Sequence, residues 1–173
     1  MKSQYHLSLG SNLGNRLHNL WMACVELCKI GVEIHAMSSV YVSQAWGMEE
    51  GAPDFYNVVI KCSSIKDEFS LLEQIKEIEK GLGRNQKSEN GKFFNRLIDI
   101  DILLKEGLIL NEKDLVIPHK ELKNRRFVLI PLQEVSPELR LPGTNEKISD
   151  IIHACKDLKT VNKLSSLGAI EAE

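Results

Sequence analysis

The segment from Asn95 to Leu104 constrains this chain most, because it places two carboxylates on one face of an apolar strand. The segment is rich in β-branched residues and contains no Gly or Pro, so it predicts a strand. Strand side chains alternate between two faces. One face then carries Leu97, Asp99, Asp101 and Leu103, and the other carries Ile98, Ile100, Ile102 and Leu104. Two like charges among apolar neighbours are costly, so the pair needs a cation or access to water.

Three solutions are open for this pair: a divalent metal, a cluster of Arg or Lys, or exposure at the edge of the sheet. Mg²⁺ takes one or two protein carboxylates and leaves its other positions to water and phosphates. Basic side chains flank the pair in the sequence, namely Arg84, Arg96, His119 and the run 123–126. A metal with guanidinium groups around it suits a polyphosphate. The alternative is a solvated acidic face, since charged residues are mostly exposed.

Composition predicts one soluble domain over residues 1–160 and a tail over 161–173 that is partly disordered. The chain has 173 residues, of which 43% are hydrophobic and 27% are charged. A net charge of −2 argues against nucleic acid or an anionic membrane as a partner. The sequence shows no apolar run of spanning length, no signal peptide and no Cys-x-x-Cys pair. We therefore expect a cytoplasmic monomer whose cysteines are buried.

Periodicity and breakers predict the order β-α-β-β-α-β, which is the ferredoxin-like arrangement. The expected strands cover residues 5–9, 32–41, 54–62 and 95–104, and the expected helices cover 13–27 and 67–82. A C-terminal extension adds an extended piece at 108–110 and helices at 128–134 and 147–154. The predicted fold class is α+β, with a largely antiparallel sheet and helices packed on it.

Several separated motifs together resemble the 6-hydroxymethyl-7,8-dihydropterin pyrophosphokinases, from the first strand to about Asp150. The motifs are Leu9-Gly10-Ser11-Asn12-Leu13-Gly14, Pro53-Asp54-Phe55-Tyr56-Asn57, Ile78-Glu79, Gly83-Arg84, Arg96-x-x-Asp99-x-Asp101, Ile117-Pro118-His119, Lys123-Asn124-Arg125-x-Phe127 and Pro131-Leu132. Each motif alone is weak, but their common order in a chain of this length is specific.

The resemblance implies an enzyme of folate biosynthesis that transfers pyrophosphate from ATP to 6-hydroxymethyl-7,8-dihydropterin and releases AMP. Two Mg²⁺ ions would be held by Asp99 and Asp101, and the catalytic residues would be these two acids with Arg84 and Arg96. The implied nucleotide contacts are Arg96, Ile100, His119 and Arg125. The implied pterin contacts are Asn12, Ser43, Trp46, Phe55, Asn57 and Phe127, with Phe55 and Phe127 as the two aromatic plates.

Residues 84–96 are polar, contain glycine and lie between the expected phosphate site and the Asp strand, which indicates a mobile lid. Two other functions remain open at this point. The Asp pair could serve a metal-dependent phosphohydrolase, which would release free phosphate instead of AMP and a pterin diphosphate. The fold could also be a non-catalytic module that binds RNA or a partner, although such a module would present a basic sheet face.

Overall fold

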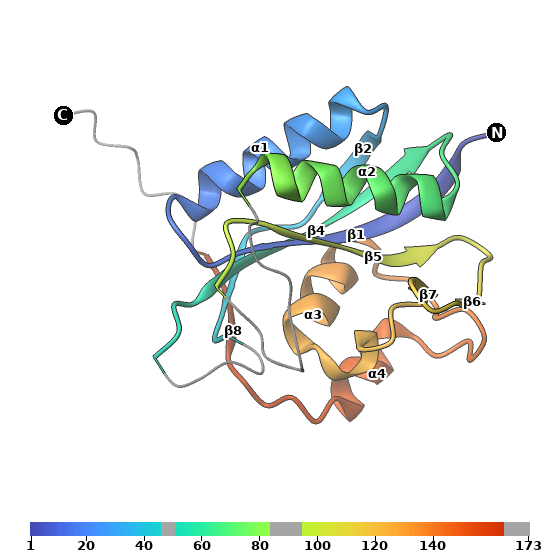
Figure 1. Cartoon of the computed structure of the whole chain (residues 1–173). Helices are drawn as coiled ribbons and strands as arrows, with labels where there is room; N and C mark the ends of the chain where they lie inside the picture. Colours follow the sequence, from blue (N-terminus) through green and yellow to red (C-terminus); the bar gives the residue numbers. More distant parts are fainter. Residues whose placement is uncertain (46–50, 84–94, 165–173) are drawn as a thin grey trace.

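A central antiparallel sheet lies between two layers of helices (Figure 1). The computed structural model describes residues 1–45, 51–83 and 95–164. Helices α1 (Arg16–Lys29) and α2 (Glu68–Gly81) cover one face of the sheet. Helices α3 (Arg126–Val135) and α4 (Ile148–Ala154) cover the other face, together with the short 3-10 helix η1 (Leu122–Asn124) that precedes α3.

Within the described residues the main sheet has six strands, ordered β5-β1-β4-β3-β8, with β2 also paired to β4. Its strands are β1 (Ser3–Ser11), β2 (Glu33–Met37), β3 (Tyr41–Ser43), β4 (Phe55–Ser64), β5 (Asp99–Lys105) and β8 (Val161–Lys163). Strands β6 (Leu110–Asn111) and β7 (Val116–Ile117) form a small separate ladder. The α+β, ferredoxin-like arrangement predicted from the sequence is confirmed.

The register of β5, β1 and β4 sets three rows of side chains across the sheet. Gly10 of β1 lies opposite both Asp99 and Asn57, and Ser8 lies opposite Asp101 and Val59. The third row joins His6 to Leu104 and Lys61. These rows belong to the face that α3 and α4 cover, and we call this face the site face.

The expected alternation along the Asp strand is wrong at Leu104. A β-bulge shifts the register between His6 and Leu7, so that these residues pair with Leu104 and Ile102 and Leu103 is the extra residue. Leu103 and Leu104 therefore both pack in the cluster beneath α3 and α4, whereas Ile102 remains in the cluster beneath α1 and α2. Alternation predicts faces only while the ladder is regular, and a bulge resets it.

The strand expected over residues 32–41 is divided in two. Both β2 and β3 pair with β4, and Ser38 lies between them. Ser38 donates its backbone N–H to the carbonyl of Val59, while its Oγ accepts from the N–H of Val59. The chain thus stays attached to β4 at this break, but without continuous strand geometry.

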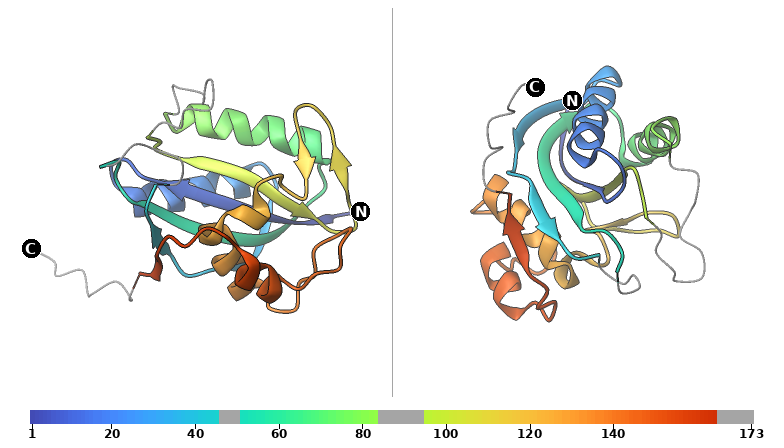
Figure 2. Two further views of the ribbon diagram at one scale, coloured as in Figure 1. Left: turned by 90° about the horizontal axis from the view of Figure 1, so that it is seen from below. Right: turned by 90° about the vertical axis from the view of Figure 1, so that its left-hand side faces the viewer.

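The C-terminal extension takes part in the sheet beyond what the sequence predicts. Residues 161–163, expected in the tail, form β8 and pair antiparallel with β3. Figure 2 shows β8 (red) beside β3 (cyan). The expected helices at 128–134 and 147–154 are confirmed as α3 and α4, with bounds shifted by one or two residues. No helix in the described ranges has the length and hydrophobicity to cross a membrane.

Candidate active site

The two acids of β5 lie on the site face, as the strand pattern predicts, and each is paired with an arginine. Nη1 of Arg96 lies 2.5 Å from Oδ2 of Asp99, and Nη1 of Arg125 lies 3.0 Å from Oδ2 of Asp101. The side chains of Arg96 and Arg125 are 10% and 14% exposed, so the guanidinium side of each pair is largely shielded from bulk water. Of the three solutions that the sequence leaves open, an arginine cluster is the one that this structure shows.

His119 completes the basic surroundings of Asp101. Its Nε2 lies 4.0 Å from Oδ2 of Asp101, and its Nδ1 accepts a hydrogen bond from the N–H of Glu121 at 3.2 Å. The imidazole therefore carries its proton on Nε2, facing the carboxylate. Burial lowers the pKa of His119, and this effect outweighs the opposing effect of the Asp101 charge. A neutral donor is thus held beside the second acid.

Glu79 is a residue whose role the sequence analysis misses. It lies on α2, is 5% exposed, and accepts a hydrogen bond from the N–H of Ile100 at 2.7 Å. This contact clamps the open edge of β5 between Asp99 and Asp101. The available signal was the position of Glu79 on the apolar stripe of α2, four residues after Ile75.

Ile100 points away from the two acids. Its side chain is 3% exposed and packs in the core cluster beneath α1 and α2. The resemblance assigns Ile100 to the nucleotide, and with this orientation only its backbone could reach a ligand on the site face.

Asn57, Ser43 and Phe55 come together on β4 and β3, which strand β1 separates from Asp99 on β5. Nδ2 of Asn57 donates to Oγ of Ser43 at 2.9 Å, and both residues are buried. No described residue donates a hydrogen bond to Oδ1 of Asn57, so this oxygen remains available as an acceptor. The Ser43–Phe55 pairing of β3 with β4 brings the half-buried ring of Phe55 to the same place.

Gly10 leaves a flat surface beside Asn57 and Phe55, and we call this place the corner above Gly10. A Cβ at Gly10 would lie 3.3 Å from Oδ1 of Asn57 and 3.5 Å from the ring of Phe55. A side chain there would fill the space over the strand, so glycine leaves room for a planar group beside the acceptor.

The side chain of Asn12 connects the backbone at Arg96 with the backbone at Pro53. Its Oδ1 accepts from the N–H of Arg96 at 2.7 Å, and its Nδ2 donates to the carbonyl of Pro53 and to Oδ1 of Asn95. The residue is 2% exposed. The resemblance assigns Asn12 to the substrate, but in this structure its side chain holds the backbone on either side of the site.

Phe127 and the C-terminal segment lie on the α3 side of the sheet. Phe127 stands at the first turn of α3 and is half-buried against the cluster beneath that helix. Asp157 accepts from the N–H of Arg126, and Lys159 donates from Nζ to the carbonyl of Ala45 at 2.8 Å. Sequence reasoning misses both C-terminal contacts, because no motif marks them.

Two predicted site residues, Arg84 and Trp46, lie outside the described residues, as does the expected lid over 84–96 except for its last two residues. Among the described residues, no group of three or more His, Cys, Asp or Glu side chains could hold a metal ion by itself. The Asp pair can therefore supply only part of a metal's ligands.

Comparison with known proteins finds relatives that share one name. The chain is 38% identical over 137 residues to the 2-amino-4-hydroxy-6-hydroxymethyldihydropteridine pyrophosphokinase of Aquifex aeolicus, covering 79% of this chain and 82% of the relative. It is 39% identical over 136 residues to the enzyme of the same name from Porphyromonas gingivalis, covering 78% and 91%.

Among solved structures, Plasmodium falciparum HPPK-DHPS wild type with pteroate superposes with a TM-score of 0.70 at 15% identity. That match covers 89% of this chain and 44% of the Plasmodium chain, and it supports the fold.

Fold, site and relatives together place this chain among the pyrophosphokinases, the transferases that move a diphosphate group from ATP to an acceptor. The sequence model of the 7,8-dihydro-6-hydroxymethylpterin-pyrophosphokinases matches residues 6–137, and the chain belongs to this family. The family resemblance and the activity expected from it are confirmed.

Proposed function

We propose that this chain carries out the family reaction at the site face, with Asp99 and Asp101 as the metal-holding acids. The hydroxymethyl oxygen of the pterin attacks the β-phosphorus of ATP, the bond from this phosphorus to the oxygen bridging it to the α-phosphorus breaks, and AMP leaves. The γ-phosphate stays attached to the transferred group, and the hydroxyl proton is lost. The observation that carries the proposal is the row Asp99–Gly10–Asn57, which joins the acids to a planar, hydrogen-bonding corner.

The residues present fit Mg²⁺, and we propose two ions. Asp99 and Asp101 are neighbours on one face and retain 22% and 32% side-chain exposure, so their oxygens can be reached from solvent. Hard carboxylate oxygens suit Mg²⁺, whose remaining positions are usually filled by water and substrate phosphates. When bound, Mg²⁺ would neutralise phosphate charge and fix the phosphate orientation.

Substrate binding would exchange the partners of the two arginines. Arg96 and Arg125 now neutralise Asp99 and Asp101. Phosphate oxygens offer guanidinium groups an equivalent charged partner, so both arginines can turn to the nucleotide and free the carboxylates for cations. His119 would donate from Nε2 to a phosphate oxygen. Such a site acts through positioning and electrostatics, which is what phosphoryl transfer requires.

The pterin would occupy the corner above Gly10. Oδ1 of Asn57 can accept from the amino or ring N–H groups of the heterocycle. Phe55 and Phe127 would stack on its two faces, which leaves the hydroxymethyl arm directed along the row toward Asp99.

We further propose that the protein acts as a cytoplasmic monomer that binds neither nucleic acid nor membrane, and that its domain, expected over residues 1–160, extends to β8 at Val161–Lys163. The net charge of −2 and the two acids on the site face support the expected absence of nucleic-acid and membrane binding, because both disfavour a polyanionic partner.

A product analysis tests the function. The full chain, ATP, Mg²⁺ and 6-hydroxymethyl-7,8-dihydropterin are incubated and followed by ³¹P NMR. We expect AMP and a pterin diphosphate in equal amounts, with turnover lost when Mg²⁺ is chelated. Release of inorganic phosphate without pterin consumption would show a phosphohydrolase instead.

A further inference from the structure

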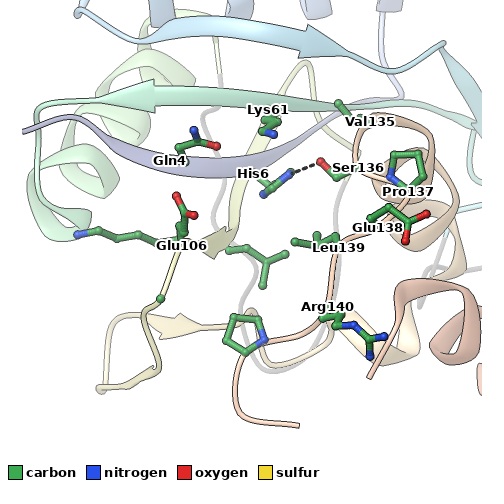
Figure 3. A pocket seen from close by; sticks show the side chains of 14 residues that line it. Gln4, His6, Lys61, Glu106, Val135, Ser136, Pro137, Glu138, Leu139 and Arg140 are labelled. Atoms are coloured by element: carbon green, nitrogen blue, oxygen red, sulfur yellow. Dashed lines mark hydrogen bonds between the residues drawn. The ribbon is translucent and has the colours of Figure 1, made fainter. Parts of the chain in front are cut away.

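A second cavity lies at the far end of the site face. It has a volume of about 540 Å³ and is formed by the third row of the sheet and by the connection between α3 and α4 (Figure 3). That volume is typical of pockets that bind small molecules. The residues lining it include none of those assigned to ATP or pterin.

The floor of this cavity contains a buried histidine. His6 is 7% exposed, and its Nε2 is hydrogen-bonded to Oγ of Ser136 at 2.8 Å. Its other ring nitrogen has no hydrogen-bond partner among the described residues and is turned toward the cavity (Figure 3). This nitrogen is not fully enclosed by protein, so a ligand atom or a water molecule can reach it from the cavity and bind there.

A lysine ammonium without a partner lies next to this histidine. Lys61 pairs with His6 across β4 and β1 and is half-buried, and within the described ranges its Nζ makes no ion pair or hydrogen bond. Its charge and, more strongly, burial lower the pKa of His6 to about 4, so the imidazole is neutral at neutral pH. The one uncompensated charge on the floor is therefore positive.

The other charged residues around the cavity are engaged elsewhere or exposed. Lys105 is paired with Glu68 at 2.6 Å, and Arg140 donates to the carbonyl of Asn145. Glu106 and Glu138 also line the cavity, but both are exposed, so water screens their charges. The cavity also has an apolar wall, formed by Leu104, Val135 and Leu139.

We propose that this cavity is a binding site for a small organic carboxylate with an apolar body. The carboxylate would pair with Lys61 and receive a hydrogen bond from the ring of His6, while the body packs on Leu104 and Leu139. An apolar wall that ends in an unpaired ammonium suits this chemistry better than a free inorganic anion, which could not use the wall.

Ligand binding in this cavity would change the position of His119 in the active site through β5. Leu104 lines the cavity, and the neighbouring bulged residue, Leu103, accepts a hydrogen bond at its carbonyl from the N–H of His119 at 2.8 Å. A ligand that shifts the bulge would therefore shift the histidine beside Asp101.

Benzoate is a suitable probe, and benzamide is its uncharged isostere. The full chain is titrated with each and followed by NMR of the backbone amides and the His6 ring. We expect saturable benzoate shifts at Gln4, His6, Leu104 and Leu139, an upward shift of the His6 titration, and at least about tenfold weaker binding of benzamide. Lys61→Met should weaken benzoate by a similar factor, whereas Lys76→Met, an exposed lysine of α2, should leave its affinity unchanged.

Equal affinities for benzoate and benzamide would overturn the proposal, and this comparison needs no variant. An unchanged benzoate affinity in Lys61→Met would also overturn it. So would the absence of saturation, or shifts centred on Asp99 and Asp101.

Discussion

Asn12 and Arg96 are joined by two hydrogen bonds although 84 positions separate them in the chain. The N–H of Asn12 donates to the carbonyl of Arg96 at 3.1 Å, and the N–H of Arg96 donates to Oδ1 of Asn12 at 2.7 Å. The loop after β1 thereby holds the residue that pairs with Asp99. The position of Arg96 beside Asp99 thus depends on a side chain that carries no charge.

Asn12→Ala should lower both stability and turnover. The substitution leaves the part-buried N–H of Arg96 and the carbonyl of Pro53 without their side-chain partner, at a cost of about 1–3 kcal/mol. We expect a lower melting temperature, and a fall in kcat because Arg96 loses its anchor. Asn162→Ala, at an exposed position of β8, is the matched control. A variant with wild-type kcat and melting temperature would show that the contact is dispensable.

Asp99→Asn and Asp101→Asn should each reduce kcat by at least about a hundredfold, because each removes a charge that we propose holds the metal–phosphate complex. Each should also lower stability without ligand by about 1–3 kcal/mol, since a shielded arginine loses its anionic partner. Steady-state kinetics and thermal unfolding measure the two effects. Asp114→Asn, an exposed acid before β7, should change neither. Turnover within a few-fold of wild type in either variant would contradict the assigned role.

Phe127→Ala should weaken pterin binding more than nucleotide binding. Stacking on one aromatic ring is worth about 1–3 kcal/mol, so we expect at least a roughly tenfold loss for the pterin. Calorimetric titration with pterin and with a non-hydrolysable ATP analogue separates the two ligands. Phe69→Ala, on the opposite side of the molecule on α2, is the control. Equal losses for both ligands would mean that Phe127 acts only in the packing beneath α3.

Lys159→Met should raise the KM for the pterin while leaving the KM for ATP unchanged. Its bond to the carbonyl of Ala45 holds the segment that follows Ser43, and a hydrogen bond of this kind contributes about 0.5–1.5 kcal/mol, or roughly two- to tenfold in affinity. Lys156→Met changes an exposed lysine of the same segment and should have no effect. If the KM for ATP rose instead, the C-terminal segment would serve the nucleotide side of the site.

The stability of the protein should fall on the acid side because of His6. Burial lowers the pKa of His6 to about 4, whereas an unfolded histidine takes up its proton near pH 6.5. Between these values the unfolded state binds more protons, so the free energy of unfolding falls as the pH falls, by at most about 1.4 kcal/mol per pH unit. The contribution of neutral His6 to the free energy of unfolding is fully present above about pH 6.5.

Urea unfolding of His6→Gln across pH 4 to 7 tests this dependence. The variant should lose part of the acid slope, while His153→Gln, on the exposed side of α4, should keep the wild-type profile. An identical slope in His6→Gln and wild type would assign the acid sensitivity to other groups.

The sequence by itself determined the local part of the site. Alternation along β5 placed Asp99 and Asp101 on one face, and helical spacing with the breakers between segments predicted α1 and α2. The separated motifs also identified the family and the side chains around the acids. These features depend on contacts between near neighbours in the chain, which periodicity records.

Only the tertiary structure decided which groups neutralise the acids and what holds them in place. The pairing of Arg125 with Asp101, the clamp of Glu79 on Ile100 and the bond from Lys159 to Ala45 all join different elements. The bulge that moves Leu104 to the other face arises from pairing with β1. Such contacts depend on how strands register and helices pack, and residues distant in sequence carry no local pattern that reports them.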